Sequence, residues 1–228
     1  MDIQLHYIEK GEGKPLVLLH GNGQSLDYFQ NQIETFSKFY RVFAVDTRGH
    51  GQSPRGTAPF TMQQFSEDLR AFLDAHNLKK IHLLGFSDGG NIALTFALRY
   101  PEYIEKLIVN GANLNTKGVK PRYQIPIELG YRFTKLFAAK NETARRKCEL
   151  LGLMVNEPNI RFAQLKNVTM PTLVLVGTND MIKDAHSRAI AAALPNAEFV
   201  ALKGGHCISK DAPEAYNRTV LDFLGKQM

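Results

Sequence analysis

Short apolar runs and helical repeats of apolar residues alternate along most of this chain. Between the runs, apolar residues recur at helical spacing, as in Phe65, Leu69 and Phe72. The alternation favours a mostly parallel sheet with helices on both faces. Strands are predicted at residues 5–9, 15–19, 42–45, 83–86, 107–109, 172–176 and 198–202.

Several helix boundaries can be predicted from local signals. Thr61 with Gln64 forms a capping box ahead of one helix, and Pro101 ends the helix that follows Ser87. The last helix is expected over residues 211–224, with Ala215, Val220 and Phe223 facing inward.

The strand and helix rhythm breaks between residues 113 and 167. Helical patterns follow one another there without a strand between them. We therefore expect a helical lid at 113–167, inserted into a single core domain made of residues 1–112 and 168–228.

Length and composition favour one soluble domain. With 228 residues and 44% hydrophobic content, the chain can bury a substantial core. The first residues lack the pattern of a signal peptide, and no apolar run approaches the roughly 18 residues of a membrane span. We expect a cytoplasmic protein in which Cys148 and Cys207 are free thiols.

The net charge of +6 belongs to one segment. Residues 116–150 carry nine basic and three acidic side chains, so the rest of the chain is balanced. Nucleic-acid binding is therefore not implied. The basic lid is either a solvated helical face or a surface that steers acidic substrates or an acidic acyl carrier toward the site.

Ser87 stands where a predicted strand meets a predicted helix, between Gly85 and Gly89. A serine attacks carbonyls only when its hydroxyl is exposed and lies next to a base. The glycines allow the sharp turn that this requires, because a Cβ at either position would clash within it. The stretch 83–91 is therefore interpreted as a nucleophile elbow.

Five motifs at the ends of predicted strands together resemble the α/β-hydrolase fold superfamily. They are His20-Gly21, Asp46-x-Arg48-Gly49-His50-Gly51-x-Ser53, Gly85-x-Ser87-x-Gly89, Gly177-x-x-Asp180 and Gly205-His206. The resemblance covers nearly the full length, with the lid outside it. It implies an α/β-hydrolase fold with a short helical lid.

The chain order serine, acid, histidine agrees with this family. Ser87 is the expected nucleophile, His206 the general base and Asp180 the residue that fixes the imidazole tautomer. The alternatives are that Asp180 only caps the following helix and that His50 is the base. The strand-end position one strand before Asp180 offers no acid, since residues 110–113 read Asn-Gly-Ala-Asn.

By the same resemblance, the backbone N–H groups of Asn22 and Asp88 form the oxyanion hole. The Asp88 carboxylate is unexpected so close to an oxyanion, because it would repel the developing negative charge. It must point away or be paired, with backbone or with a basic side chain, or else receive a cationic group of the substrate.

The resemblance implies a serine hydrolase that cleaves a carboxylic ester of small or medium acyl length through an acyl-enzyme. Phe133 and Phe137 of the lid are candidates for an apolar acyl pocket. No metal or organic cofactor is expected. The alternatives are lactone, carbon–carbon bond or perhydrolase chemistry with the same residues, and a non-catalytic ligand receptor on the same fold.

Overall fold

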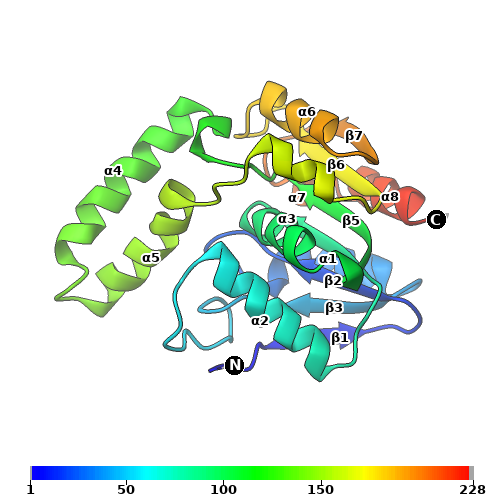
Figure 1. Ribbon diagram of the computed structural model, residues 1–228, viewed down its shortest axis with the longest axis horizontal. Coiled ribbons are helices and arrows are strands. Elements are labelled where there is room, and N and C mark those ends of the chain that lie inside the picture. Colours follow the sequence, from blue (N-terminus) through cyan, green and yellow to red (C-terminus); the bar gives the residue numbers. More distant parts are fainter. Residues whose placement is uncertain (1, 226–228) are drawn as a thin grey trace.

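A seven-stranded sheet forms the centre of the molecule. The computed structural model describes residues 2–225 of the chain, and its strands run in the order β1-β3-β2-β4-β5-β6-β7 (Figure 1). Within residues 2–225, β1 is the only strand that is antiparallel to its neighbour, and the other strand pairs are parallel. The strands are β1 (Tyr7–Lys10), β2 (Pro15–Leu19), β3 (Arg41–Val45), β4 (Ile81–Phe86), β5 (Ile104–Asn110), β6 (Thr172–Gly177) and β7 (Ala197–Leu202).

Helices follow the strands in the predicted alternation. The α-helices are α1 (Gln30–Phe36), α2 (Met62–Ala75), α3 (Asp88–Arg99), α4 (Pro121–Phe137), α5 (Glu142–Asn156), α6 (Asp184–Ala193), α7 (Ile208–Asp211) and α8 (Pro213–Leu224). Residues 2–225 also contain four 3-10 helices, namely η1 (Leu26–Phe29), η2 (Pro101–Tyr103), η3 (Thr116–Gly118) and η4 (Phe162–Asn167).

The central strands bury both of their faces. Val17 and Leu83 point toward the layer of α2, α3 and α6, whereas Leu16 and Leu84 point toward the layer of α1 and α8. This period-two alternation divides the core into two apolar layers, one on each side of the sheet. Strands covered on both faces have little reason to carry polar residues, which explains their continuous apolar sequences. The predicted α/β-hydrolase fold is confirmed.

Two details of the predicted helices differ from the structure. Thr61 Oγ1 accepts a hydrogen bond from Gln64 N at 3.1 Å, but the Gln64 side chain donates to Asp68 and does not complete the capping box. In α8, Ala215 is exposed and Tyr216 is buried instead. Val220 is buried as predicted, whereas Phe223 is half-buried and Leu224 is buried beside it.

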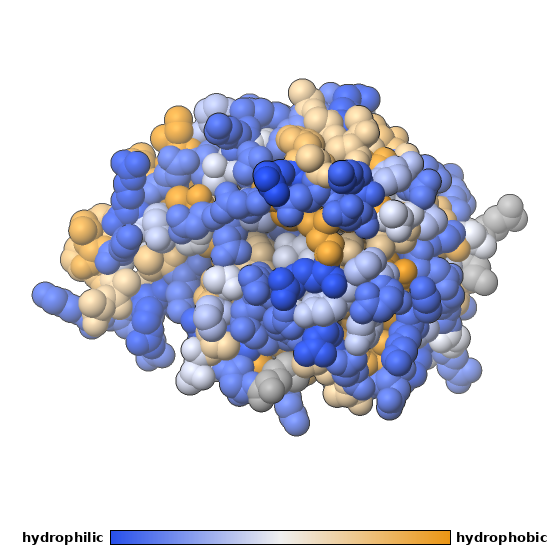
Figure 2. Space-filling model, viewed as in Figure 1, coloured by the Kyte–Doolittle hydropathy of each residue, from blue (hydrophilic) through white to orange (hydrophobic). Residues whose placement is uncertain are grey.

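The two lid helices, α4 and α5, extend away from the sheet (Figure 1). They pack on each other, and a Cβ on Gly130 of α4 would lie 3.4 Å from Leu151 Cδ1 of α5. In the same segment, η4 instead packs its Leu165 into the core layer of α2 and α3. Apolar side chains remain exposed along one face of α4, and Figure 2 shows apolar surface at the outer end of the helical pair; the exposed residues are Ile125, Leu129, Phe133, Leu136 and Phe137.

The basic side chains of the lid are turned to solvent. All nine except Lys120 are exposed. Lys120 is half-buried, and its Nζ donates a hydrogen bond to the backbone oxygen of Asp180 at 2.5 Å. The positive charge of residues 116–150 is therefore mainly solvent-exposed.

Candidate active site

Ser87 occupies a strained turn between β4 and α3. Its backbone angles, φ 53° and ψ −119°, are unusual for a residue with a side chain. A Cβ on Gly85 would lie 2.2 Å from the backbone oxygen of Gly89, and one on Gly89 would lie 2.1 Å from that of Leu19. Only glycine fits at these two positions, so the local sequence dictates the turn that presents the Ser87 hydroxyl.

The structure brings Asp180 and His206 to this serine. His206 Nε2 lies 2.9 Å from Ser87 Oγ, and His206 Nδ1 lies 2.7 Å from Asp180 Oδ1. Asp180 is 3% exposed, and the same oxygen accepts a hydrogen bond from Ile182 N at 2.9 Å. A buried carboxylate on Nδ1 leaves Nε2 as the acceptor that can take the serine proton.

The loops that carry the acid and the histidine touch through their main chains. A Cβ on Gly177, at the end of β6, would lie 1.9 Å from the backbone oxygen of Gly205. Asn179 N donates to Gly204 O at 2.8 Å. These main-chain contacts by themselves hold the two loops next to each other.

His50, the alternative base, lies elsewhere. Its ring is buried, with Nδ1 near Thr47 Oγ1 and the backbone oxygen of Arg48. Burial lowers the pKa of His50 to about 4. The turn that contains it is held by the buried Arg48, which forms ion pairs with Asp68 and Asp2, so this motif has a structural role.

The two predicted oxyanion donors flank the serine. Gly21 approaches so closely that a Cβ there would lie 3.1 Å from Ser87 Cβ, which places the loop of Asn22 beside the nucleophile. Asp88 is the first residue of α3, whose N-terminal amides favour negative charge. Both residues therefore lie beside Ser87, and their backbone N–H groups remain the predicted oxyanion donors.

The Asp88 carboxylate is paired with two side-chain amides. Oδ2 accepts from Asn22 Nδ2 at 2.8 Å, and Oδ1 accepts from Asn91 Nδ2 at 3.2 Å. The expected backbone or basic partner is therefore wrong. Burial raises the pKa of Asp88 to about 6, the negative charge of Glu157 adds to this rise, and the two amides and His206 oppose it.

A cavity of about 20 Å³ opens beside the nucleophile. It is lined by Ser87, Asp88, Asn113, Val119, Gln124, Met154, Glu157, Met181 and Ile182. Phe133 and Phe137 are not among these residues. Their side chains are 64% and 48% exposed on α4, so the structure does not place them at the site as substrate contacts.

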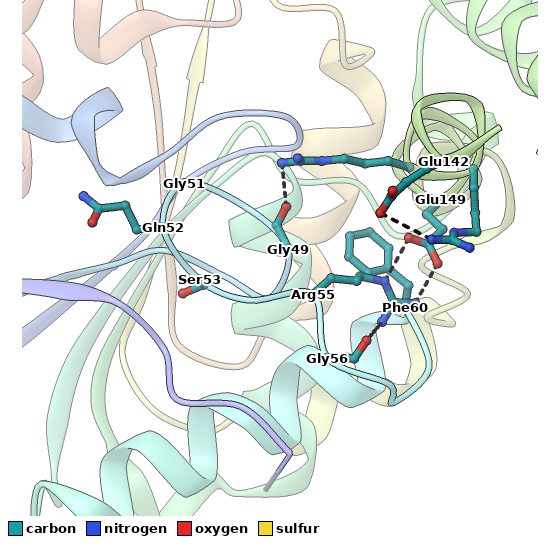
Figure 3. A pocket seen from close by; sticks show the side chains of 11 residues that line it. Gly49, Gly51, Gln52, Ser53, Arg55, Gly56, Phe60, Glu142 and Glu149 are labelled. Atoms are coloured by element: carbon teal, nitrogen blue, oxygen red, sulfur yellow. Dashed lines mark hydrogen bonds and ion pairs between the residues drawn. The ribbon is translucent and has the colours of Figure 1, made fainter.

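A larger cavity of about 390 Å³ is shown in Figure 3, and Ser87 is not among its lining residues. It is formed by the loop after β3 and by α5. Arg55 spans it, with Nη2 2.6 Å and Nε 2.9 Å from the two carboxylate oxygens of Glu149. No residue of the predicted catalytic set lines it, so we assign the chemistry to the smaller cavity.

Sequence reasoning did not find Asn91, Gln124 or Glu157. Asn91 follows the elbow by one helical turn, a spacing that could have suggested its contact with Asp88. Gln124 and Glu157 lie in the lid, and no motif marks them. Both reach the site only through the way in which α4 and α5 pack over it.

Comparison with known proteins agrees with this geometry. The family described as "alpha/beta hydrolase fold" matches residues 14–145, which is more than half of the chain. The chain belongs to this family. Its relatives are hydrolases, so this protein is a hydrolase enzyme as well.

Three similar proteins illustrate the range. "Putative carbamate hydrolase RutD" of Caulobacter sp. is 29% identical, over 97% of this chain and 94% of its own. A 2-hydroxy-6-oxononadienedioate/2-hydroxy-6-oxononatrienedioate hydrolase of Paraburkholderia phymatum is 29% identical, over 99% and 92%. The crystal structure of a hydrolase from Pseudomonas aeruginosa superimposes with a TM-score of 0.81 at 26% identity, covering 98% of this chain and 95% of that one.

In residues 2–225, no helix has the length and apolar character needed to cross a membrane. Cys148 and Cys207 are free, as predicted.

Proposed function

We propose that this hydrolase cleaves a carboxylic ester of small or medium acyl length through an acyl-enzyme on Ser87. The observation that carries the proposal is the continuous chain of contacts from Asp180 through His206 to Ser87 Oγ. This arrangement supplies a nucleophile, a base and a group that orients the base.

The reaction would follow from the atoms in place. His206 Nε2 takes the proton of Ser87 as Oγ attacks the ester carbonyl, and Asp180 stabilises the imidazolium that forms. The backbone N–H groups of Asn22 and Asp88 stabilise the oxyanion. His206 then protonates the departing alcohol, and it later activates the water that releases the acid.

The test is labelling by a serine-directed fluorophosphonate together with ester turnover. Ser87→Ala should abolish labelling and lower kcat by about 10⁴-fold or more. Ser37→Ala, at the half-buried residue that follows α1, is the matched control and should retain both. Labelling without turnover of any substrate would contradict the proposal and favour a ligand receptor on the same fold.

A second candidate is hydrolysis of a different acyl bond by the same residues. It is favoured by the relatives, whose names include a carbamate and a 2-hydroxy-6-oxononadienedioate as substrates. A panel of esters, lactones, carbamates and carbon–carbon bond substrates separates the two. The proposed ester activity requires that the highest kcat/KM in this panel belong to an ester.

A further inference from the structure

The cavity beside Ser87 is lined with hydrogen-bond acceptors from three elements. Asp88 comes from α3, Gln124 from α4, and Glu157 directly follows α5. Gln124 is 7% exposed, and its Oε1 has no hydrogen-bond partner within residues 2–225. A buried amide oxygen left unpaired costs free energy, so it requires an explanation.

The orientation of the Gln124 amide is fixed by its other atom. Nε2 donates to Glu128 Oε1 at 3.1 Å and points toward Met154 O at 3.5 Å. Both of these oxygens can only accept, so exchanging the positions of nitrogen and oxygen would set acceptor against acceptor. The nitrogen is thus directed at Glu128 and Met154, and Oε1 is the amide atom left without a partner beside the cavity that Gln124 lines.

Glu157 contributes a second carboxylate next to that of Asp88. Its Oε2 accepts a hydrogen bond from Met62 N at 2.6 Å, and it is half-buried. Burial raises the pKa of Glu157, and its charge in turn raises the pKa of Asp88. Two carboxyl groups and an amide whose oxygen is unpaired therefore line the same small cavity.

The lining residues supply few hydrogen-bond donors that could pair with these acceptors. Their side-chain N–H groups belong to Gln124 and Asn113, and Asn113 Nδ2 donates to Asn115 O at 3.0 Å. None of the basic residues of the lid lines this cavity. A group bound in the cavity must bring its own donors if Gln124 Oε1 is to be paired.

We propose that this cavity binds an N–H donor group of the substrate, a primary ammonium or a primary carboxamide, close to the carbonyl attacked by Ser87. The inference rests on the proposed function because it assigns part of the ester substrate. The volume of about 20 Å³ suits the terminal NH₃⁺ or NH₂ of such a group, and the convergent acceptors disfavour groups that only accept.

Matched esters test the preference. Ethyl succinamate and ethyl levulinate differ only by an NH₂ group in place of a CH₃ group, and β-alanine ethyl ester and ethyl butanoate differ only by an ammonium in place of a methyl. We expect kcat/KM to be at least about tenfold higher for at least one N–H donor ester than for its partner. The pair with the larger ratio tells carboxamide from ammonium. Monoethyl succinate, which only accepts, should be poor.

Two variants connect the preference to the cavity. Gln124→Met removes the unpaired oxygen at similar volume, and Glu157→Gln removes charge while it keeps an acceptor for Met62 N. Gln124→Met should bring the ratio of donor to partner ester toward one, and Glu157→Gln should lower it most for the ammonium ester. The controls Gln30→Met and Glu142→Gln, both exposed, should keep the wild-type ratios. Thermal melting and phosphonate labelling verify that each variant is folded.

A binding measurement separates this inference from the ester activity. Propanamide or propylammonium should slow phosphonate labelling of Ser87 in a saturable way, whereas butan-2-one, which only accepts hydrogen bonds, should not. Protection without ester turnover would retain the donor site and reject the proposed function. Ester turnover with no donor preference and no protection would overturn the donor site and leave the proposed function standing.

Discussion

The side-chain amide of Asn22 donates a hydrogen bond of 2.8 Å to Asp88 Oδ2. The two residues predicted to supply the oxyanion donors are therefore also linked through their side chains. The same nitrogen donates to Leu150 O of α5 at 2.9 Å. One amide thus connects the oxyanion loop, the start of α3 and the lid.

Replacing Asn22 by leucine should lower catalysis while retaining its backbone N–H. Asn22→Leu removes a donor to a buried carboxylate, and such a bond contributes about 1.5–3 kcal/mol, so kcat/KM for p-nitrophenyl acetate should fall roughly ten- to hundredfold. The exposed Asn31→Leu serves as the control. An unchanged kcat/KM in Asn22→Leu would show that this link does not support the reaction.

The raised pKa of Asp88 predicts how stability depends on pH. The folded carboxyl has a pKa of about 6, against 3.8 in its ordinary state, so the folded protein binds this proton more tightly than the unfolded chain. Its contribution to the free energy of unfolding is greatest at low pH and is lost as pH rises from about 4 to above 6.

Asp88→Asn should remove this loss. The unfolding free energy of the variant minus that of the wild type should increase by about 3 kcal/mol as pH rises from about 3.5 to 7. Urea denaturation at several pH values measures the gain. Asp184→Asn, at an exposed site, should show no such trend. A constant difference between Asp88→Asn and wild type across this range would contradict the assignment.

Gly85 should tolerate no side chain. Gly85→Ala would place a Cβ 2.2 Å from the backbone oxygen of Gly89, so we expect the elbow to distort, with loss of phosphonate labelling and a clear drop in melting temperature. Gly130→Ala in α4 meets only Leu151 Cδ1 at 3.4 Å, and it should stabilise the lid by about 0.5–1 kcal/mol. Labelling of Gly85→Ala at the wild-type rate would refute the steric argument.

The ion pair between Arg55 and Glu149 should hold the lid closed. It joins the loop after β3 to α5, and the cavity beside Ser87 is too small for a whole ester until the lid moves. Arg55→Met should raise kcat/KM for bulky esters a few-fold and destabilise the fold by no more than about 1 kcal/mol.

Arg188→Met is the matched control, since it breaks an exposed ion pair with Asp184 within α6. High salt should bring the wild type toward the rates of Arg55→Met, because the Arg55 side chain is 34% exposed and its charge can be screened. If Arg55→Met and Arg188→Met behave alike on bulky and small esters, the ion pair does not control entry.

The strands and most helices follow from apolar spacing, and the positions of Ser87, Asp180 and His206 follow from the rule that sites gather at the carboxyl ends of parallel strands. The orientation of a lid helix does not follow from such patterns. Phe133 and Phe137 share a face of α4, but spacing alone cannot tell whether that face meets the core or solvent. For the same reason Gln124 and Glu157 could not be predicted, because helix packing alone brings them to Ser87.

The backbone contact between Gly177 and Gly205 bears on how this enzyme can be re-engineered. Contacts between their loops position Asp180 and His206 together. Two of the three acceptor residues that line the cavity beside Ser87, Gln124 and Glu157, belong instead to the lid segment. Transplanting a lid from a relative should therefore change substrate choice and spare the acid–base pair. Exchanging the loop of Asp180 without that of His206 should fail.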